Sequence, residues 1–491
     1  MTDQNDPVVA IIGAGFGGIC MAVKLKRAGV SFTIVEKADR VGGVWRDNVY
    51  PGAACDVPSH LYSYSFEPSA DWSRAYGQAP EIRSYIESCA RKYGIIEHIR
   101  FAAEVAGAVF DADSGGWVVT LAGGSQIRCR FLVSATGQLS RPAEPDFPGL
   151  DSFSGKVFHS ARWDHDYDMT GKHVAVIGSG ASAIQFVPQI APKVARLHLF
   201  QRSAPYVLPK PDRAYSPLEK YLYAHFPSAL VVSRARKYIY HEMRVLPLTR
   251  GYGVGLVEKL FAKHLRRHVP DPALRERLTP DYPLGCKRVL ISNEWYPAVS
   301  RSNVEVVSAG LSEIRGDRVI GTDGTEREVD AIVFGTGFAV SEFLAPMRIV
   351  GREGVDLREA WRNGAEAHLG ITVSGFPNFF ILYGPNTNLG HNSIVYMLER
   401  QTDYVLSAIR HIGTYGRGWV DVRPDAQQRY NEELQQRLGG TVWESGCTSW
   451  YRTDGGKNTS NWPSFTFEYS RRTRYFDAGN YHHHTAGVLV S

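Results

Sequence analysis

The sequence predicts an α/β fold with two Rossmann-like domains and a helical insertion in the second of them. A short apolar run meets a glycine turn at residues 8–18, and the same combination returns at residues 173–183. Buried parallel strands are continuous apolar runs, and a glycine turn behind one lets backbone amides approach a pyrophosphate at a helix start. Each combination therefore predicts one dinucleotide-binding site. Residues 211–283 have helical spacing and form the predicted insertion.

The length and composition predict a multidomain globular protein. The 491 residues exceed one ordinary core, so two or three domains are expected. Hydrophobic residues make up 44% and charged residues 21% of the chain, and no run reaches the roughly 18 apolar residues of a membrane-spanning helix. The N-terminal residues MTDQNDP are polar and lack the apolar core of a signal peptide. We therefore expect a cytoplasmic protein without a membrane span.

Charge and cysteine usage exclude several classes of function. The formal net charge is +5, with no Lys/Arg block of the nucleic-acid-binding type, so no nucleic-acid partner is expected. The cysteines are scattered and no CxxC occurs. This argues against a disulfide framework, a zinc site and a dithiol flavin reductase, and no metal site is predicted. The cysteines are Cys20, Cys55, Cys89, Cys129, Cys286 and Cys447.

The first glycine turn has the spacing of a dinucleotide fingerprint. The run VVAII meets GAGFGG, which supplies Gly13, Gly15 and Gly18 in GxGxxG order. A helical pattern follows, and the next apolar run ends at Glu36. This acid lies about twenty residues past the glycines, where a carboxylate can accept hydrogen bonds from an adenosine ribose. A turn between a strand and a helix, with this acid, predicts the first nucleotide site.

The second turn is not followed by an acid of the kind that Glu36 provides after the first. The run HVAVI meets Gly178, Gly180 and Ala183, and the next strand, RLHLF, is followed closely by Arg202 and Ser203. A guanidinium and a hydroxyl suit a 2′-phosphate, which an acid would repel. The second nucleotide is therefore predicted to be NADPH rather than NADH.

The insertion at residues 211–283 mixes basic and bulky apolar residues and allows two interpretations. One is an amphipathic patch that faces a membrane. The other is a helical unit that packs on the nucleotide domain and shapes a substrate entrance. We favour the second interpretation, because acids and prolines interrupt the stretch and no face is cleanly apolar.

Three further patterns resemble those of Baeyer-Villiger flavoprotein monooxygenases. They are GGVWRDNVYPGAACD, which contains Trp45 and Asp56; the linker FxGxxxHxxxWD, which contains Phe153, Gly155, His159, Trp163 and Asp164; and the pair Lys287-Arg288. The resemblance extends from the first glycine turn to the Trp-rich C-terminal region. Monooxygenases that oxidise nitrogen or sulfur have an aromatic then a basic residue at the end of the linker, and Trp163-Asp164 departs from that pattern. Ala183 replaces the more usual third glycine.

The resemblance implies a resident FAD at the first site, a diffusing NADPH at the second, and dioxygen as the acceptor of electrons. A ketone would be converted to an ester or lactone through a C4a-peroxyflavin, with a thioether as a second possible substrate. Arg288 and Asp56 are the predicted catalytic residues: the guanidinium cannot lose its proton at working pH, and the acid orients it. Lys287 would contact the NADP phosphate. Trp45, Asp56 and Asn388, the last in a loop expected to start a helix, complete the predicted cofactor-binding set.

Two other functions stay open, as do the domain limits and the assembly. The alternatives are an N- or S-oxygenating flavin monooxygenase and a non-catalytic flavin- and NADPH-binding redox module; the intact Asp56, Lys287 and Arg288 argue against the latter. We expect a monomer or a homodimer. The predicted segments are residues 1–145 and 341–491 for the FAD-binding domain with the active-site loops, 146–210 and 284–340 for the NADPH-binding domain with its linker, and 211–283 for the insertion.

Overall fold

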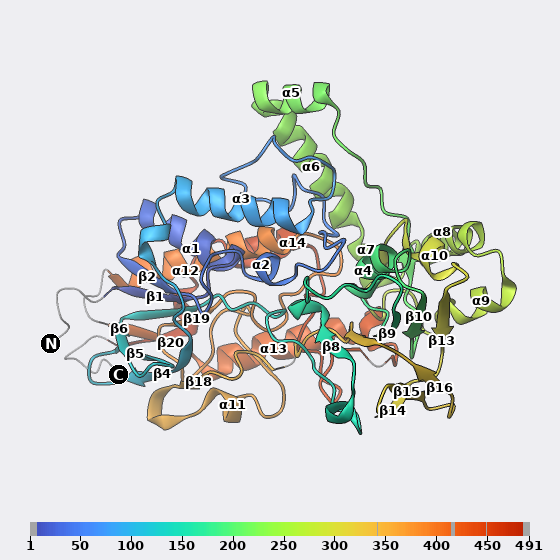
Figure 1. Cartoon of the computed structure of the whole chain (residues 1–491). Coiled ribbons are helices and arrows are strands. Elements are labelled where there is room, and N and C mark those ends of the chain that lie inside the picture. The colour runs from blue at the N-terminus through green and yellow to red at the C-terminus, as the bar shows by residue number, and fades with distance from the viewer. Residues whose placement is uncertain (1–6, 341, 414–417, 448, 485–491) are drawn as a thin grey trace.

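Two parallel sheets organise the computed structural model, which describes residues 7–340, 342–413, 418–447 and 449–484 (Figure 1). Every strand pair in these two sheets is parallel. The first sheet has the order β19 (Phe379–Ile381), β7 (Phe131–Ser134), β1 (Val9–Ile12), β2 (Phe32–Val35) and β3 (Ile99–Arg100). The second has the order β13 (Val304–Val307), β10 (Arg196–Phe200), β9 (His173–Ile177), β17 (Ala331–Phe334) and β8 (Lys156–His159).

In each sheet, the strand before a glycine turn lies in the interior. β1 is flanked by β7 and β2, and β9 is flanked by β17 and β10. All residues of β1, β2, β7 and β17 are buried, which explains why these strands are continuous apolar runs. The turns therefore open at the carboxyl ends of interior strands, where ligands bind in open α/β sheets.

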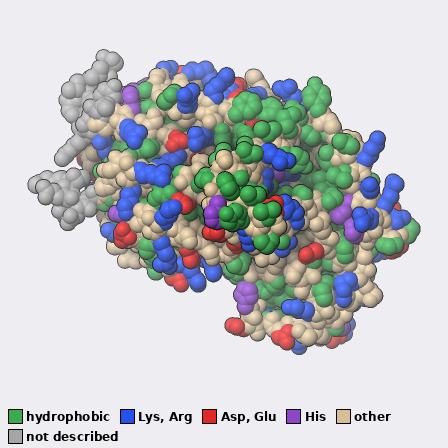
Figure 2. Space-filling model, turned by 90° about the horizontal axis from the view of Figure 1, so that it is seen from above, with side chains coloured by type: hydrophobic (Ala, Val, Ile, Leu, Met, Phe, Trp, Pro, Cys, Tyr) green, Lys and Arg blue, Asp and Glu red, His purple; other side chains and the backbone are tan. Residues whose placement is uncertain are grey.

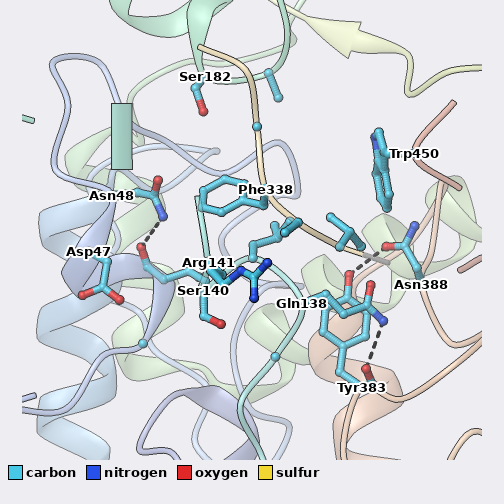
Figure 3. Close-up of a pocket in the computed structure, with 18 of the residues that line it drawn as sticks. Asp47, Asn48, Gln138, Ser140, Arg141, Ser182, Phe338, Tyr383, Asn388 and Trp450 are labelled. Atoms are coloured by element: carbon cyan, nitrogen blue, oxygen red, sulfur yellow. Dashed lines mark hydrogen bonds between the residues drawn. The ribbon is translucent and has the colours of Figure 1, made fainter. Parts of the chain in front are cut away.

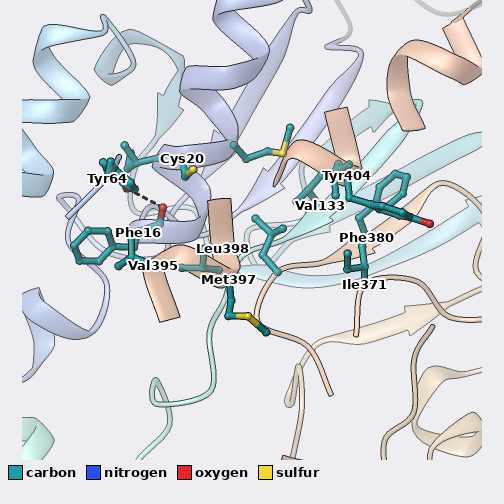
Figure 4. Packing of buried hydrophobic residues seen from close by; sticks show 14 of the residues in the cluster. Phe16, Cys20, Tyr64, Val133, Ile371, Phe380, Val395, Met397, Leu398 and Tyr404 are labelled. Carbon is teal, nitrogen blue, oxygen red and sulfur yellow. Dashed lines mark hydrogen bonds between the residues drawn. The ribbon is translucent and has the colours of Figure 1, made fainter. Parts of the chain in front are cut away.

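The helix after each turn packs on its own sheet. α1 (Phe16–Arg27) follows the first turn and lies against α12 (Ile394–Gly413), where Lys24 donates to the Glu399 carbonyl oxygen at 2.6 Å. Figure 4 shows this core, in which the Tyr64 hydroxyl donates to the Phe16 carbonyl oxygen. α4 (Ala183–Ile190) follows the second turn, and Trp163 packs on its Phe186. Chain segments far apart in sequence thus hold each turn in place.

The predicted insertion is helical. Its helices follow β11 (Val207–Leu208) and precede β12 (Leu290–Ile291) in the chain, and these two strands pair in parallel. They are α5 (Pro217–His225), α6 (Pro227–Met243), α7 (Val245–Arg250), α8 (Val254–His268) and α9 (Pro272–Arg277). In Figure 1, α5 and α6 project from the body of the molecule. No helix in the described ranges is long and apolar enough to cross a bilayer.

The remaining elements cover the two sheets. Small sheets join β18 (Arg348–Val350), β4 (Val105–Asp111), β5 (Gly116–Leu121) and β6 (Gln126–Cys129); β14 (Leu311–Arg315), β15 (Arg318–Gly321) and β16 (Glu326–Glu328); and β20 (Trp419–Val422) with β21 (Tyr481–His484). The other helices are α2 (Val44–Asp47), α3 (Ala79–Lys92), α10 (Trp295–Val299), α11 (Leu357–Ala360), α13 (Pro424–Leu438) and α14 (Thr466–Arg472).

Candidate active site

One cavity of about 1040 Å³ extends across both glycine turns. This volume is slightly above the 300–1,000 Å³ typical of pockets for one drug-sized ligand, so the cavity has room for long ligands. The predicted site residues that line it are Gly13, Gly15, Glu36, Trp45, Asp56, Gly178, Gly180, Arg202, Ser203, Lys287, Arg288 and Asn388. Gly18 and Ala183 lie beneath the turns, outside this lining. The structure thus brings residues from four of the five predicted segments to one space.

The first turn is tightly closed under its third glycine. A Cβ added to Gly18 would lie 1.9 Å from the Gly13 carbonyl oxygen, so only glycine fits. The middle glycine, Gly15, faces Gly43 of the second pattern, and a Cβ on Gly15 would lie 3.6 Å from the Gly43 Cα. Backbone rather than side chains therefore surrounds this turn. Such a cradle fits a pyrophosphate that approaches the start of α1.

Glu36 is held by three donors at the end of β2. Its Oε2 accepts a hydrogen bond from the Ala14 amide at 2.8 Å, and its Oε1 accepts from the Ala38 amide at 3.0 Å. Arg46 donates to the same Oε1 at 2.8 Å. An ionised carboxylate has about four acceptor positions, so Oε2 keeps one for a ribose hydroxyl. The residues at the first site fit an adenosine diphosphate portion such as that of FAD.

The second turn is more open. A Cβ on Gly180 would meet no atom closer than the Gly335 carbonyl oxygen at 3.9 Å. Ala183 is fully buried as the first residue of α4, and its methyl group is accommodated where the first turn tolerates only hydrogen. The turn leaves open space beside its backbone at Gly180. This arrangement fits a second pyrophosphate.

Two cations and a hydroxyl meet beyond β10. Lys287 donates to the Ser203 Oγ at 2.8 Å, and its Nζ lies 4.4 Å from the centre of the Tyr282 ring. Burial lowers the pKa of Lys287, and the nearby charge of Arg202 lowers it further. Across the described ranges, neither Lys287 nor Arg202 makes an ion pair with a carboxylate within 4.0 Å. The charge of Asp281 acts on Lys287 in the opposite sense without forming an ion pair within 4.0 Å. Two adjacent positive charges without an ion-paired acid fit an anionic group such as a 2′-phosphate.

Arg288 and Asp56 form a hydrogen-bonded ion pair in the cavity wall. The Asp56 Oδ2 accepts from Arg288 Nε at 3.0 Å and from Nη2 at 2.5 Å. Burial raises the pKa of Asp56, but the charge and hydrogen bonds of Arg288 outweigh this effect and the net pKa is lowered. The charge of Asp56 in turn raises the pKa of Arg288. Arg288 therefore remains positively charged, and Nη1 is not used in its hydrogen bonds to Asp56.

The C-terminal third supplies the neighbours of this pair. The Tyr383 hydroxyl donates to Asn388 Oδ1 at 2.7 Å, and Gln138 donates to the Tyr383 carbonyl oxygen at 3.0 Å (Figure 3). Tyr451 is buried, and burial raises its pKa to about 12 despite the charge of Arg288. Both phenols are therefore neutral near the guanidinium. Trp450 also lines the cavity.

The residues of the linker fingerprint make structural contacts within the second domain. His159 ends β8, is buried, and accepts a hydrogen bond from the Ala161 amide through Nδ1 at 3.0 Å. Trp163 packs on Phe158, and Asp164 pairs with Lys156 at 2.7 Å. These contacts fold the linker onto the edge of the second sheet. None of the linker residues named in the sequence pattern lines the described cavity.

One expectation about the cysteines is wrong. A disulfide joins Cys286 to Cys447, whereas the scattered spacing argued against disulfides. The two residues are 161 positions apart, so local spacing carried no signal for their pairing. Cys286 directly precedes Lys287 and Arg288. The bond therefore ties the segment with the cations to the C-terminal loop that carries Trp450.

Several residues of the site escaped prediction. Arg46 neutralises Glu36, Lys210 and Arg244 add positive charge near Asp56, and Tyr383 and Tyr451 lie near Arg288. Arg46 lies within the second pattern and ten residues after Glu36, which was a usable signal. The others meet Asp56 and Arg288 only through long-range contacts, which a single sequence does not encode locally.

The comparisons with known proteins agree with this geometry. The chain matches the family described as flavin-binding monooxygenase-like over residues 7–349. A protein of Streptomyces coelicolor named Baeyer-Villiger monooxygenase is 47% identical over 477 residues, covering 96% of this chain and 92% of that protein. This chain belongs to the Baeyer-Villiger monooxygenase family. The family resemblance seen in the motifs is thereby confirmed.

Solved structures support the same Baeyer-Villiger fold. A steroid monooxygenase bound to NADP is 34% identical, with a TM-score of 0.84 and coverage of 95% of this chain and 97% of that one. The complex of OTEMO with FAD and NADP is 28% identical, with a TM-score of 0.88 and coverage of 97% and 99%. The predicted α/β fold with two Rossmann-like domains is confirmed over nearly the full length.

Proposed function

We propose that the protein is an FAD-containing monooxygenase that uses NADPH and dioxygen to convert a ketone into an ester or lactone. The observation that carries the proposal is the Arg288–Asp56 pair, which lies in the wall of a cavity lined by both glycine turns. A permanent positive charge at this position suits a reaction in which negative charge develops on oxygen. The family membership supports the same activity.

The two nucleotides divide between the two turns. The first turn and Glu36 would hold FAD, and the second turn with Arg202, Ser203 and Lys287 would hold NADPH. Bound FAD, reduced by NADPH, supplies the activated oxygen. Tyr451 is buried and Tyr383 is half-buried beside the cavity, and their raised pKa values keep both phenols neutral next to the reacting space.

Arg288 is the proposed catalytic residue. Its guanidinium stays protonated and offers donors to an oxyanion formed on the substrate carbonyl. Asp56 acts through Arg288 and is a positioning residue: it fixes the guanidinium by accepting from Nε and Nη2. A carboxylate with a lowered pKa remains ionised and in place at neutral pH.

The second substrate class, the domain limits, the assembly and the cellular location are also proposals. Thioethers are a second substrate class, because oxygen transfer to sulfur forms no carbonyl oxyanion and depends less on Arg288. We propose that residues 1–145 and 341–491 form the FAD-binding domain and that residues 146–210 and 284–340 form the NADPH-binding domain, with 211–283 inserted. We further propose a monomer or homodimer in the cytoplasm. Because the cytoplasm keeps thiols reduced, Cys286 and Cys447 would be open there, which rapid alkylation after lysis would test.

The test is product analysis by mass spectrometry. Yellow protein is mixed with NADPH, oxygen and a panel of linear, cyclic and aryl ketones, with amines and thioethers in parallel. We expect esters or lactones that carry one added oxygen atom. N-oxides without esters would favour the N-oxygenating alternative. If no compound of the panel caused NADPH to be consumed, a non-catalytic module would be favoured.

The positioning role of Asp56 has its own readout. In Asp56→Asn, the hydrogen-bond geometry can persist while the charge is lost. We expect a lower rate of ester formation and a larger share of NADPH oxidation that ends in hydrogen peroxide, with unchanged FAD content. Equal ester yield per NADPH in the variant and the parent would contradict this role.

A further inference from the structure

The insertion exposes an unusual concentration of large apolar side chains. Of the 19 large hydrophobic residues that are exposed within the described ranges, 12 lie between Leu218 and Leu260. They are Leu218, Tyr221, Leu222, Phe226, Val231, Val232, Ile239, Tyr240, Met243, Tyr252, Leu256 and Leu260. Figure 2 looks down on α5 and shows hydrophobic side chains gathered at the centre of this face. Exposed apolar side chains gathered in this way mark an interaction site.

The same segment is strongly basic. Residues 217–268 contain ten Lys and Arg and three Asp and Glu, a net charge of +7, whereas the whole chain has only +5. Six of the cations are exposed, and Glu258 is the one fully exposed acid among the three. The exposed cations are Arg236, Arg250, Lys259, Lys263, Arg266 and Arg267. The rest of the chain is therefore slightly acidic, and the positive charge is concentrated on the insertion.

The projecting helices have a firmly held base and an uncovered outer side. Arg234 on α6 donates to the His60 and Ser63 carbonyl oxygens at 2.8 and 2.9 Å. The buried Glu242 accepts from Asn392 and from the Thr466 amide, both at 2.5 Å. The inner side of α6 is thus fixed to the first domain. The apolar side chains on the outer side are presented by a fixed scaffold.

The α5 end is also ordered. Ser216 caps α5 by accepting from the Glu219 amide at 3.2 Å, and the Glu219 side chain accepts from the Ser216 amide in return. Leu218, Tyr221 and Leu222 follow on this capped helix with exposed fractions of 67%, 55% and 38%. A capped helix that still leaves three such side chains in water indicates a partner for that side.

We propose that the outer face of α5, α6 and α8 docks on an anionic lipid bilayer. Apolar side chains would enter the boundary between headgroups and acyl chains, and the surrounding cations would pair with lipid phosphates. A second copy of this chain fits less well, because two-fold pairing of the same face would bring two segments of charge +7 together. A projecting helix pair also suits a deformable surface better than a flat protein face. The mode is peripheral, and it does not depend on the proposed reaction.

Vesicle co-sedimentation tests the proposal with the FAD-loaded full-length protein. One set of vesicles contains phosphatidylcholine alone, and the other contains phosphatidylcholine and phosphatidylglycerol. We expect binding to the anionic vesicles to be at least about tenfold tighter than to the neutral ones. Raising the salt from about 0.1 M to about 1 M shortens the screening length from about 10 Å to about 3 Å and should release most of the protein.

Two variants separate the apolar and the charged contributions. Leu222→Ser/Phe226→Ser/Val231→Ser should weaken binding by more than about tenfold through lost apolar burial. Lys259→Gln/Lys263→Gln/Arg267→Gln should weaken it by about a hundredfold, at roughly fivefold for each cation. The matched controls are Val109→Ser/Val355→Ser, which removes exposed apolar residues elsewhere, and Arg315→Gln/Arg318→Gln, which removes exposed cations elsewhere. Both controls should bind as the parent does.

Retained FAD and an unchanged melting temperature show that each variant is folded, so that lost binding reports the surface. The proposal is overturned if the parent binds neither vesicle, or if it binds both equally without salt dependence. It is also overturned if sedimentation velocity shows a dimer that the apolar variant abolishes while vesicle binding is absent, because the face would then join two copies of the chain.

Discussion

At the first glycine turn, the buried charge at the end of β2 is already paired within the protein. Glu36 is 4% exposed and accepts from two amides and Arg46, and a Cβ on Gly18 would collide with Gly13. At the second turn, Arg202 is exposed, Lys287 has only the Ser203 hydroxyl as a hydrogen-bond partner among the described residues, and Ala183 fits where glycine is expected. The same arrangement of strand and turn is thus tightly packed at the first site and leaves two cations without an ion pair at the second.

This difference teaches how one fold can hold a resident and an exchanging cofactor. A cradle whose charges are already paired has a rigid form before binding, and a ligand enclosed by it dissociates slowly. Two adjacent cations without an ion-paired acid attract an anionic ligand, which can pair with both of them when it is bound. The first site therefore suits FAD that stays, and the second suits NADPH that comes and goes.

The largest expected effect is that of a substitution at the first nucleotide site. Gly18→Ala would place a methyl group 1.9 Å from the Gly13 carbonyl oxygen, and we expect the protein to purify without FAD or to misfold. The matched change, Ala183→Gly, should cost at most about 1 kcal/mol in the free energy of unfolding and should leave FAD bound. Absorbance of bound flavin and thermal melting measure both. A fully yellow, stable Gly18→Ala protein would contradict the account.

The next largest effect is expected from a substitution of Arg288, which belongs to neither nucleotide turn. Arg288→Ala removes the charge beside Asp56 and should slow ester formation by about a hundredfold to a thousandfold. Neither nucleotide turn contains Arg288, so FAD content and the affinity for NADP⁺ should change little. Ester yield by mass spectrometry, with NADP⁺ titration, separates these quantities. Unchanged ester formation would remove Arg288 from the mechanism.

A smaller effect sharpens the second site. Arg202→Gln and Lys287→Gln each remove one charge-assisted contact to the 2′-phosphate, worth about 1.5–3 kcal/mol or roughly 10- to 150-fold in NADPH affinity. NADH lacks this phosphate, and its affinity should hardly change. Arg196→Gln, at the other end of β10, is the control. Equal losses for NADPH and NADH in the Lys287 variant would show that the residue does not select the phosphate.

The smallest effect is a pH dependence of the second site. Because burial and the charge of Arg202 lower the pKa of Lys287, its positive charge is lost as pH rises through a value below 10.5. NADPH affinity should therefore fall as the solution is made alkaline, by up to tenfold per pH unit. The affinity for NADH, and that of Lys287→Gln for NADPH, should lack this slope. A slope that persists in Lys287→Gln would assign the titration to another group.

The sequence predicted the two Rossmann-like units and the charged residues of the site better than it predicted the contacts that the last third of the chain makes with them. Apolar runs before glycines determine interior parallel strands, so both Rossmann-like units were predictable, as was the helical insertion. Arg288 and Asp56 were predictable as a pair only through the family patterns, since 232 positions separate them. The positions of Tyr383 and Tyr451 and the Cys286–Cys447 bond depend on how the last third of the chain returns to the first domain. No local spacing encodes that return.

The most direct test of the comparison is retention of the two nucleotides. Protein loaded with FAD and NADP⁺ is passed through repeated gel filtration, and both nucleotides are quantified in the protein fraction by chromatography. The account predicts that FAD remains stoichiometric while NADP⁺ is lost within the first passages. Loss of both at the same rate, or retention of NADP⁺ after FAD has left, would contradict the assignment of a closed first site and an exchanging second one.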